Sequence, residues 1–501
     1  MTSTSHGRTT PAGGDDAFNR VTAILDGDSA NAPTLAQYAC VGLSAIVHVD
    51  SPEPSLRYDL AFGTGTDPYT GIDQFDRIVD LRWWNTSSGQ DVERIQHGYD
   101  LAGNRLWRQT PVGAALGVNM DELYTYDGVN QLKTFARGRL TSDQSVITAG
   151  TETFAQAWSL DPTGNWSEFQ EDSTGSGTWD LDQPRTHNAV NEITAFGANA
   201  GSQWAAPTYD RTGNMTALPQ PASPGEGFTC TYDAWNRLVS VAAATSGQPV
   251  ARYQYDGRGY RTVAQSYASG VLSETRDFYY SDQWQIVEDR VGHATAERQF
   301  VWGSRYVDDL LVRDRDTTGD GTLDERLFAL QDPNWNVTGL SDPTGTLVER
   351  YGYSAYGVPT FLTGAFAGSS SSYDAETLYC GYRWDSGARA YFVRHRVLWS
   401  QVGRWDRRDP VGYLGGVSLY CAYFVPHGPD PSGEWWGGVF SVVDHKQHSN
   451  CQCYSGVPSD LARLEGDGLR EVRAEMGLPK AMAPSPAAAV PDLRPGYAGG
   501  L

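Results

Sequence analysis

The chain has 501 residues, with 60 acidic and 38 basic side chains and a formal net charge of −22. This acidic excess, which is spread along the chain, excludes a general binder of nucleic acid or of anionic membranes, because both need a basic face. No run of about 20 apolar residues is present, so no membrane-spanning helix is predicted. The 55 Gly, 27 Tyr and 16 Trp beside only 5 Met are typical of strands and turns.

The N-terminal residues 1–14 are polar and lack the apolar stretch of a signal peptide, so they are predicted to be disordered. From Asp15 the sequence follows the repeat described next, with that aspartate in the place of its tyrosine. We therefore expect the chain to begin inside a repeat array, and this end leaves the export route open.

Residues 15–270 repeat one phrase with variations. The phrase is complete at Tyr99–Leu106 and returns at Tyr126–Leu132 and Tyr232–Leu238. Several steps of about 22 to 27 residues are in the range of repeat architectures, in which like units stack to bury their apolar faces. The aspartate or asparagine that marks each copy stands at Asp16, Asp73, Asp100, Asp127, Asp161, Asn188, Asp210, Asp233 and Asp256.

Each copy has the pattern of a β-hairpin. The residues before the tyrosine alternate between apolar and polar, as in Phe228–Tyr232, which predicts a strand. The Asp-x-x-Asn or Asp-x-x-Gly-Asn that follows predicts a turn, since these side chains bond nearby backbone and Gly or Asn tolerates positive φ. An ordinary β-sandwich with chance Tyr-Asp pairs is the alternative, but the turn residues recur in register with the tyrosine. The Ser-, Thr- and Gly-rich stretches 141–157 and 170–186 are interpreted as surface loops.

Beyond the repeats, the chain divides by composition. Residues 271–360 contain further strand patterns, and a Ser- and Gly-rich connector at 361–375 leads into a region rich in motifs that ends at Gly433. Residues 434–501 form a tail with a short helical pattern and a Pro-, Ala- and Gly-rich end that is predicted to be disordered.

Several of these motifs resemble a known family. The phrase Tyr-Asp-x-x-Gly-Asn-Arg-Leu is similar to the YD repeat of bacterial RHS proteins and animal teneurins. Over residues 15–433 the resemblance implies an all-β fold, in which YD-repeat hairpins form a curved, spiralling, shell-like sheet. The RHS repeat-associated core domain, at 361–433, would close this shell, and a short, mostly irregular tail would follow. The stretches that resemble the core domain are Gly381–Gly387, Gly403–Trp405, Asp409–Gly412 and Asp430–Gly433.

Two clusters contain residues that could form metal sites. Asp316, Asp320 and Asp324 occupy positions of a calcium loop, but the twelfth position, which needs a bidentate Glu, is Leu327. The alternative for this stretch is an acidic hairpin loop. The second cluster could make a tetrahedral zinc site, a polar loop or a redox pair, and consists of His445, His448, Cys451 and Cys453. No metal and no other cofactor is predicted.

Two aspartates in matching Asp-Pro-x-Gly phrases, Asp409 and Asp430, could supply acid–base chemistry. Two carboxylates at short range push one pKa up, so that one stays protonated while the other activates water, as in aspartic proteases. The resemblance implies that this pair, with Arg404 holding one carboxylate ionised, cleaves the chain just after the second phrase. The expected bond joins Glu434 and Trp435, although many family members have Leu in place of the glutamate. The alternative is that both phrases only form tight turns.

Three functions remain open. The first is an RHS/YD shell-type structural protein that encloses or presents its own C-terminal tail, at the cell surface or in competition between cells. The second is a toxin carrier that cleaves itself and releases the residues after about 434. The third is a surface module that binds carbohydrate, since Trp and Tyr can stack on sugar faces. No small-molecule turnover and no nucleic-acid partner are expected, and secretion or cell-surface display follows from the resemblance alone.

Overall fold

The computed structural model describes residues 20–27, 32–42, 45–422, 425–426 and 428–434, all of which lie in one compact unit. These residues form two large antiparallel sheets and a third, small one, with a single short α-helix, α1 (Pro111–Ala115), among them. The expected all-β fold is confirmed. Among the described residues, no helix is both long enough and apolar enough to cross a membrane.

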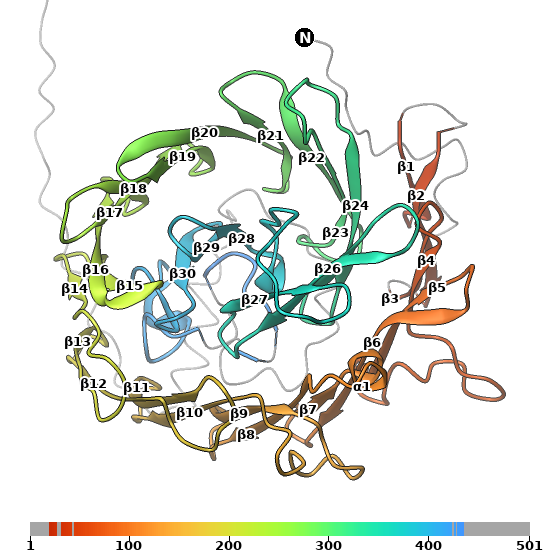
Figure 1. Cartoon of the computed structure of the whole chain (residues 1–501), viewed down its shortest axis with the longest axis horizontal. Helices are drawn as coiled ribbons and strands as arrows, with labels where there is room; N and C mark the ends of the chain where they lie inside the picture. The colour runs from red at the N-terminus through yellow and green to blue at the C-terminus, as the bar shows by residue number, and fades with distance from the viewer. Residues whose placement is uncertain (1–19, 28–31, 43–44, 423–424, 427, 435–501) are drawn as a thin grey trace, which may run out of the picture. The chain divides into compact units, whose positions relative to one another are not determined.

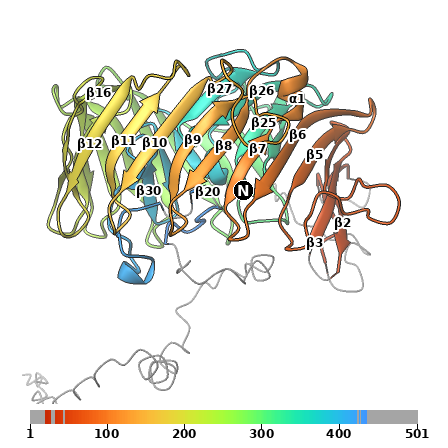
Figure 2. The ribbon, with the colours of Figure 1, turned by 90° about the horizontal axis from the view of Figure 1, so that it is seen from below.

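The first large sheet has 13 strands, and each strand pairs with its sequence neighbours. Figure 2 shows many of these strands side by side and tilted the same way. Their bounds are β1 (Ala23–Leu25), β2 (Thr34–Val41), β3 (Ala45–Ser51), β4 (Leu56–Asp59), β5 (Asp80–Asn85), β6 (Gln90–Tyr99), β7 (Arg105–Gln109), β8 (Asp121–Tyr126), β9 (Leu132–Gly138), β10 (Phe154–Leu160), β11 (Trp166–Asp172), β12 (Leu181–His187) and β13 (Ile193–Phe196).

The second large sheet has 14 strands in the same simple order. Its strands are β14 (Thr208–Tyr209), β15 (Met215–Gln220), β16 (Ser223–Tyr232), β17 (Leu238–Ala243), β18 (Pro249–Tyr255), β19 (Arg261–Ala268), β20 (Val271–Tyr280), β21 (Ile286–Val291), β22 (Ala296–Trp302), β23 (Leu310–Arg315), β24 (Glu325–Gln331), β25 (Val337–Ser341), β26 (Leu347–Tyr353) and β27 (Pro359–Thr363).

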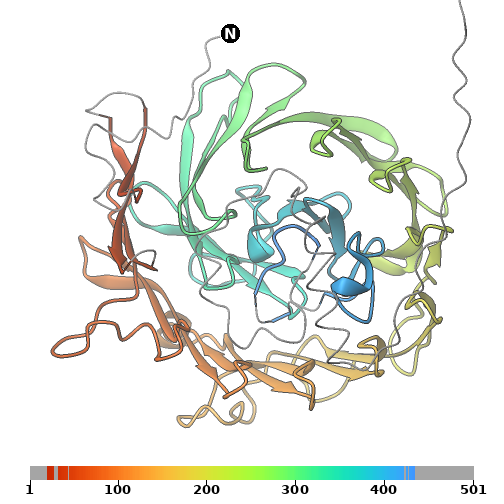
Figure 3. The ribbon, with the colours of Figure 1, turned by 180° about the vertical axis from the view of Figure 1, so that it is seen from behind.

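The small sheet lies inside the curve of the two large sheets, as Figures 1 and 3 show from opposite sides. Tyr253 of β18 donates from its hydroxyl to Asp385 at 3.0 Å, and Arg383 donates to Asp289 of β21 at 2.7 Å, so the small sheet is bound to the second large sheet. Its four strands and the two short 3₁₀ turns near them are η1 (Tyr379–Gly381), β28 (Arg383–Asp385), β29 (Ala390–Val393), β30 (Arg396–Trp399), β31 (Arg404–Trp405) and η2 (Gly412–Leu414).

The same kind of five-residue turn recurs in the hairpins of both large sheets. In the copy at Asp233, the aspartate Oδ1 accepts the backbone N–H of Trp235 and of Arg237, each at 2.9 Å. The fourth residue, Asn236, has a φ of 62°, which produces the bulge that shifts the register between Thr231 and Tyr232. The same fourth position has positive φ at Asp76, Gly103, Asn130, Gly164, Asn191, Gly213, Gly259, Trp284, Trp335, Gly345 and Gly357.

The repeated tyrosines tie each hairpin to the one before it. The Tyr232 hydroxyl donates to the carbonyl of Met215 at 3.0 Å, and the Tyr255 hydroxyl donates to the carbonyl of Leu238 at 2.8 Å. In both cases the acceptor residue directly follows the preceding turn. Tyr99, Tyr126, Tyr280 and Tyr353 make the same contact, so the repeated tyrosines point to one side.

The structure corrects the expectation of a single continuous sheet. After β13 the chain folds back so that Ala200 bridges Asp182 of β12, and the second sheet starts afresh at β14. The indole of Trp204 packs against Phe196 in this break, at a centroid distance of 5.7 Å. The interpretation of 141–157 and 170–186 as surface loops is also partly wrong. Residues 154–157 belong to β10, and the two ends of 170–186 lie in β11 and β12. Their apolar and aromatic residues pack into the sheet despite the many Ser, Thr and Gly around them.

The beginning of the first sheet packs against the end of the second. The Trp83 indole of β5 donates to the carbonyl of Gln331 at 3.0 Å, and Arg350 of β26 forms a buried ion pair with Glu93 of β6. The sheets therefore overlap, and contacts between residues about 250 positions apart hold the overlap together.

Candidate functional site

The last described residues, 428–434, are called the terminal segment here. They lie along the loop between β29 and β30, and three successive residues of that loop and strand donate to three successive carbonyls. Arg394 donates to the carbonyl of Pro431, the His395 backbone N–H to that of Ser432 at 3.1 Å, and Arg396 Nε to that of Gly433. The terminal segment is therefore held in one register against the small sheet.

The C-terminal end of this segment lies beside a buried pair of carboxylates. Nη2 of Arg396 lies 2.8 Å from Oδ2 of Asp409 and 3.6 Å from Oδ2 of Asp430. Arg396 and Asp430 side chains are each 1% exposed, and Asp409 is 8% exposed. The two sequence-predicted aspartates are thus brought together at one guanidinium group.

Both aspartates also form turns of the kind seen in the repeats. Oδ1 of Asp430 accepts the backbone N–H of Gly433 at 2.9 Å and of Glu434 at 3.2 Å, while Oδ1 of Asp409 accepts that of Val411 at 3.0 Å. The Asp430 Oδ2 atom is buried without a hydrogen bond. Burial, with a smaller contribution from the negative charge of Asp409, raises the pKa of Asp430 above its ordinary value.

Gly433 is required by this geometry. Its φ is +70°, and a Cβ atom there would stand 3.1 Å from the carbonyl oxygen of Val393 and 3.2 Å from the backbone nitrogen of Arg396. Only glycine takes this conformation and this close approach without strain.

Arg404 does not lie beside the aspartate pair, which corrects the expectation from the sequence. It is fully buried and donates to the carbonyl of Asn191 at 2.8 Å and to Oδ1 of Asn165 at 2.6 Å. Both acceptors belong to turns of the first large sheet, so Arg404 binds the small sheet to that large sheet. The cation at the carboxylates is instead Arg396, the first residue of β30. An arginine beside the otherwise apolar run of β30 was the signal that could have identified it.

Glu434 lies beside the imidazole of His395. Its Oε1 lies 3.6 Å from Nδ1 of His395, and burial, then the charge of Asp409, raises the Glu434 pKa. A cavity of about 120 Å³ adjoins this point, between the β29–β30 hairpin and the inner face of the second sheet. Burial, and then the positive charge of Arg407, lowers the His395 pKa to about 4, so this imidazole is neutral near pH 7. Trp435, the other residue of the expected scissile bond, lies outside the described residues.

The acidic cluster that the sequence suggested as a calcium site does not form one among the described residues. Asp316 uses its carboxylate to accept the backbone N–H groups of Gly319 and Gly321, each at 2.7 Å, and Asp324 accepts the N–H of Thr317 at 2.8 Å. Asp320 accepts the N–H of Thr322 in the same way. These are the bonds of a self-contained acidic loop, and no group of three or more His, Cys, Asp or Glu that could hold a metal occurs in the described ranges. The other candidates, His445, His448, Cys451 and Cys453, lie outside those ranges.

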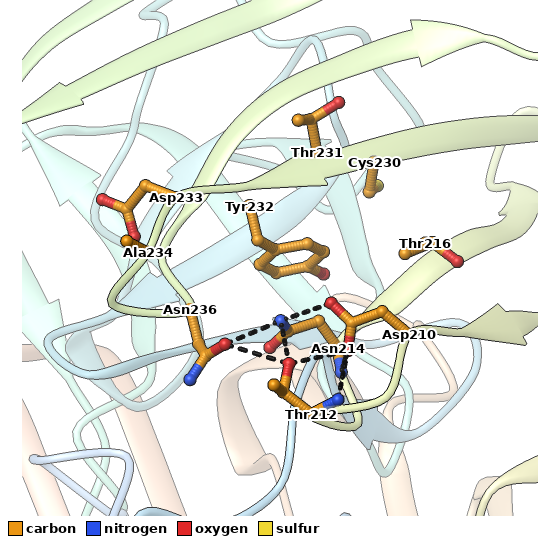
Figure 4. Close-up of a pocket in the computed structure, with 10 residues that line it drawn as sticks. All are labelled: Asp210, Thr212, Asn214, Thr216, Cys230, Thr231, Tyr232, Asp233, Ala234 and Asn236. Carbon is orange, nitrogen blue, oxygen red and sulfur yellow. Dashed lines mark hydrogen bonds between the residues drawn. The ribbon is translucent and has the colours of Figure 1, made fainter.

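A second hollow, of about 420 Å³, lies between the turns at Asp210 and Asp233 (Figure 4). Its polar atoms are largely used within the repeat. The Asn214 amide donates to Asp210 at 2.8 Å and to Asn236 at 2.9 Å, and Thr212 donates to Asn236 at 3.0 Å. These bonds link one turn to the next, so the hollow is a by-product of the repeat and not an assembled catalytic site.

Comparisons with known proteins relate part of the sequence to tRNA nucleases, two of which are described here. No protein-family model matches the chain. The tRNA(Glu)-specific nuclease WapA of Bacillus subtilis subsp. natto is 27% identical over 281 residues, and the tRNA nuclease WapA of Bacillus subtilis is 25% identical over 263 residues. The alignments cover 54% and 51% of this chain but 11% and 10% of the relatives. The chain thus spans about a tenth of the length of these relatives.

Two solved structures that contain TccC3 are similar to this chain in fold alone. The crystal structure of TcdB2-TccC3-Cdc42 has a TM-score of 0.61 at 16% identity, and covers 83% of this chain and 20% of that one. The Photorhabdus luminescens Tc holotoxin pore with a mutated TccC3 has a TM-score of 0.61 at 14% identity, and covers 86% and 20%. The curved antiparallel sheets of this chain therefore share their fold with part of these two structures.

Proposed function

We propose that this chain is part of an RHS/YD-type shell protein of the toxin class, which carries its own C-terminal residues and cleaves itself at the end of the core region. The observation that carries the proposal is the meeting of Asp409, Asp430 and Arg396 around the chain's own peptide at Gly433–Glu434. The fold and the partial likeness to WapA support the shell and toxin parts of the proposal.

The proposed division of the chain follows the sequence: a disordered N-terminus at 1–14, repeats at 15–270, terminal strands at 271–360, a core region at 361–433 and a tail at 434–501. Strand β27 continues to Thr363, so the second sheet reaches slightly beyond the proposed start of the core region. The tail would be the carried cargo.

In the proposed reaction, water is the nucleophile and the bond between Glu434 and Trp435 is broken. Asp409 takes one proton from the water as its oxygen adds to the carbonyl carbon of Glu434, and Asp430 gives its proton to the carbonyl oxygen. When the intermediate collapses, the C–N bond breaks, the amine of Trp435 takes the proton from Asp409, and Asp430 recovers its own. Arg396 balances the charge of the pair and fixes the preceding carbonyl.

The intact mass of the purified full chain tests this proposal. The wild type should give a chain that ends at Glu434 and a second fragment, whereas Asp409→Asn should give one intact species. Asp342→Asn is the matched control, because Asp342 forms the same Asp-Pro-x-Gly turn in the second sheet without an arginine at its carboxylate. A chain that ends at Gly433 would move the scissile bond by one residue. A wild type that stays intact, or an Asp409→Asn variant that is cut as fast, would refute self-cleavage.

The cleavage rate should also depend on pH. The proposed acid is the protonated form of Asp430, whose pKa burial raises, so the rate should fall as the pH rises through that raised value.

A further inference from the structure

We propose that Trp284 and His395 are positioning residues for the terminal segment. The turn of the second sheet that carries Trp284 would then help to set the position of the peptide that is cut. This inference rests on the proposed self-cleavage. Neither residue is one of the reacting groups. Trp284 would act through the imidazole of His395, and His395 would act through its bonds to the segment.

Trp284 stands in an unfavourable backbone conformation. It occupies the fourth position of the turn at Ser281, where its φ is +62°, a position held by Gly or Asn in most of the other repeats. Bulky residues rarely adopt this conformation, and they keep it only where the surroundings hold them. The turn itself supplies little support, because Ser281 replaces the aspartate and its Oγ accepts the N–H groups of Gln283 and Gln285 at 3.2 and 3.3 Å.

The indole of Trp284 is held by ring contacts instead. Its centroid lies 4.3 Å from that of Tyr260 and 4.9 Å from that of His395, with the imidazole edge-on at 74°. Tyr260 belongs to the neighbouring turn of the same sheet. His395 belongs to the small sheet, so this contact joins the rim of the large sheet to the loop that grips the terminal segment.

The loop that carries His395 needs such support. Val393 pairs with Arg396, so Arg394 and His395 form a two-residue hairpin loop. The favoured turns for such loops need positive φ at one or both residues, and neither residue has it. The loop is held from outside: Arg394 donates to Asp308 at 2.7 Å, Arg407 donates to the His395 carbonyl, and Trp284 packs on the imidazole.

His395 passes this constraint to the segment through two contacts. Its backbone N–H donates to the carbonyl of Ser432 at 3.1 Å, and its Nδ1 lies 3.6 Å from Oε1 of Glu434. These contacts lie on either side of Gly433, whose carbonyl accepts from Arg396. A shift of the imidazole would therefore displace the peptide from the carboxylate pair without removing any catalytic group.

The decisive variant is Trp284→Gly in the full-length chain. Glycine accepts the positive φ, so a purely structural tryptophan and a positioning tryptophan give different results. We expect self-cleavage, followed by intact mass, to slow by roughly 10- to 100-fold with an unchanged or higher Tm. Trp284→Phe keeps a ring at this place and should recover most of the rate, and His395→Ala should be as slow as Trp284→Gly. The control is Trp235→Ala, which removes a 72% exposed indole from a nearby turn and should leave the rate unchanged.

Hydrogen exchange in the Asp409→Asn background gives a readout that does not depend on cleavage. Adding Trp284→Gly should speed amide exchange at Gly433 and Glu434 without a change at the turn of Asp233. A wild-type cleavage rate in Trp284→Gly, or slow cleavage with a lowered Tm and unchanged exchange, would overturn the inference. If the wild-type chain is never cut, the proposed function fails, and the exchange result alone then decides whether the positioning contact exists.

Discussion

At the scale of single residues, the same side chain serves two purposes in this protein. The carboxylate of Asp233 closes a turn and pairs with Arg237 of that same turn. The carboxylate of Asp430 closes a turn with Oδ1, but its buried Oδ2 lies 3.6 Å from Arg396, which also pairs with a second carboxylate, Asp409. A turn former becomes a candidate catalytic group when burial and a second carboxylate are added, because both favour the protonated form. The turn is local, but the neighbours that change the role of the carboxylate are not.

Asp406 offers a residue-scale test through pH. It is fully buried, and burial raises its pKa to about 6. The folded state thus binds its proton more tightly than the unfolded state does, and stability is lost as the pH rises from about 4 through 6, by up to about 3 kcal/mol. Asp406→Asn should remove this loss, because the amide stays neutral and its oxygen can still accept the N–H of Val397.

Thermal unfolding of both proteins from pH 4.5 to 7.5 measures this effect. The Tm of Asp406→Asn should rise relative to the wild type as the pH increases. Two parallel curves would show that the Asp406 carboxyl does not titrate differently in the folded and unfolded states.

At the scale of elements, each hairpin is fixed to the previous one through its tyrosine. We predict that Tyr232→Phe, which removes the hydroxyl and its bonds to the carbonyls of Met215 and Asp406, lowers the free energy of unfolding by about 1 kcal/mol. Tyr232→Ala also removes the ring from between the hairpins and should cost about 3 kcal/mol. The readout is the shift in Tm or in the denaturant midpoint.

The matched control for this prediction is Tyr279→Ala. Tyr279 is a 44% exposed strand tyrosine of the same sheet, and its removal should change stability by less than about 0.5 kcal/mol. Equal effects of Tyr232→Ala and Tyr279→Ala would mean that the repeated tyrosine does not bind neighbouring hairpins together.

At the scale of the whole molecule, contacts between distant parts of the chain hold the sheets in place. Arg350 pairs with Glu93 and donates to the carbonyls of Val92 at 2.6 Å and Gly364 at 2.8 Å. Burial raises the Glu93 pKa despite this partner. We predict that Arg350→Met costs about 3–5 kcal/mol, because it leaves a buried carboxyl group without its cation.

Chemical unfolding together with limited proteolysis measures this prediction, since loss of the pair should expose the start of the first sheet to cutting. Arg290→Met is the control, because its ion pair with Glu288 is at the surface and should be worth less than about 1 kcal/mol. A loss no larger than that of the control would show that the overlap of the two sheets does not depend on the pair. The double variant with Glu93→Gln should recover part of the loss.

The sequence by itself determined the repeating hairpin, because its signals act over a few residues. The aspartate of the turn bonds backbone two and four residues onward, and Gly or Asn supplies the positive φ at the fourth place. The resemblance of Asp409–Gly412 and Asp430–Gly433 to the family core domain likewise selected two aspartates that the structure brings together. Trp284 and Trp335 have positive φ at the fourth place of two other such turns, and no local sequence signal predicts this conformation for a tryptophan.

The tertiary structure decided what lies beyond the reach of a hairpin. It set the break after β13 and the overlap of the two sheets. It also placed Arg396 at the carboxylate pair and Arg404 against turns of the first sheet. The overlap and the places of the two arginines depend on which partner each buried charge finds, more than ten and often more than two hundred residues away. Burial makes an unpaired charge costly, so partners are chosen by the packing of the whole fold, and that choice leaves little trace in the local sequence.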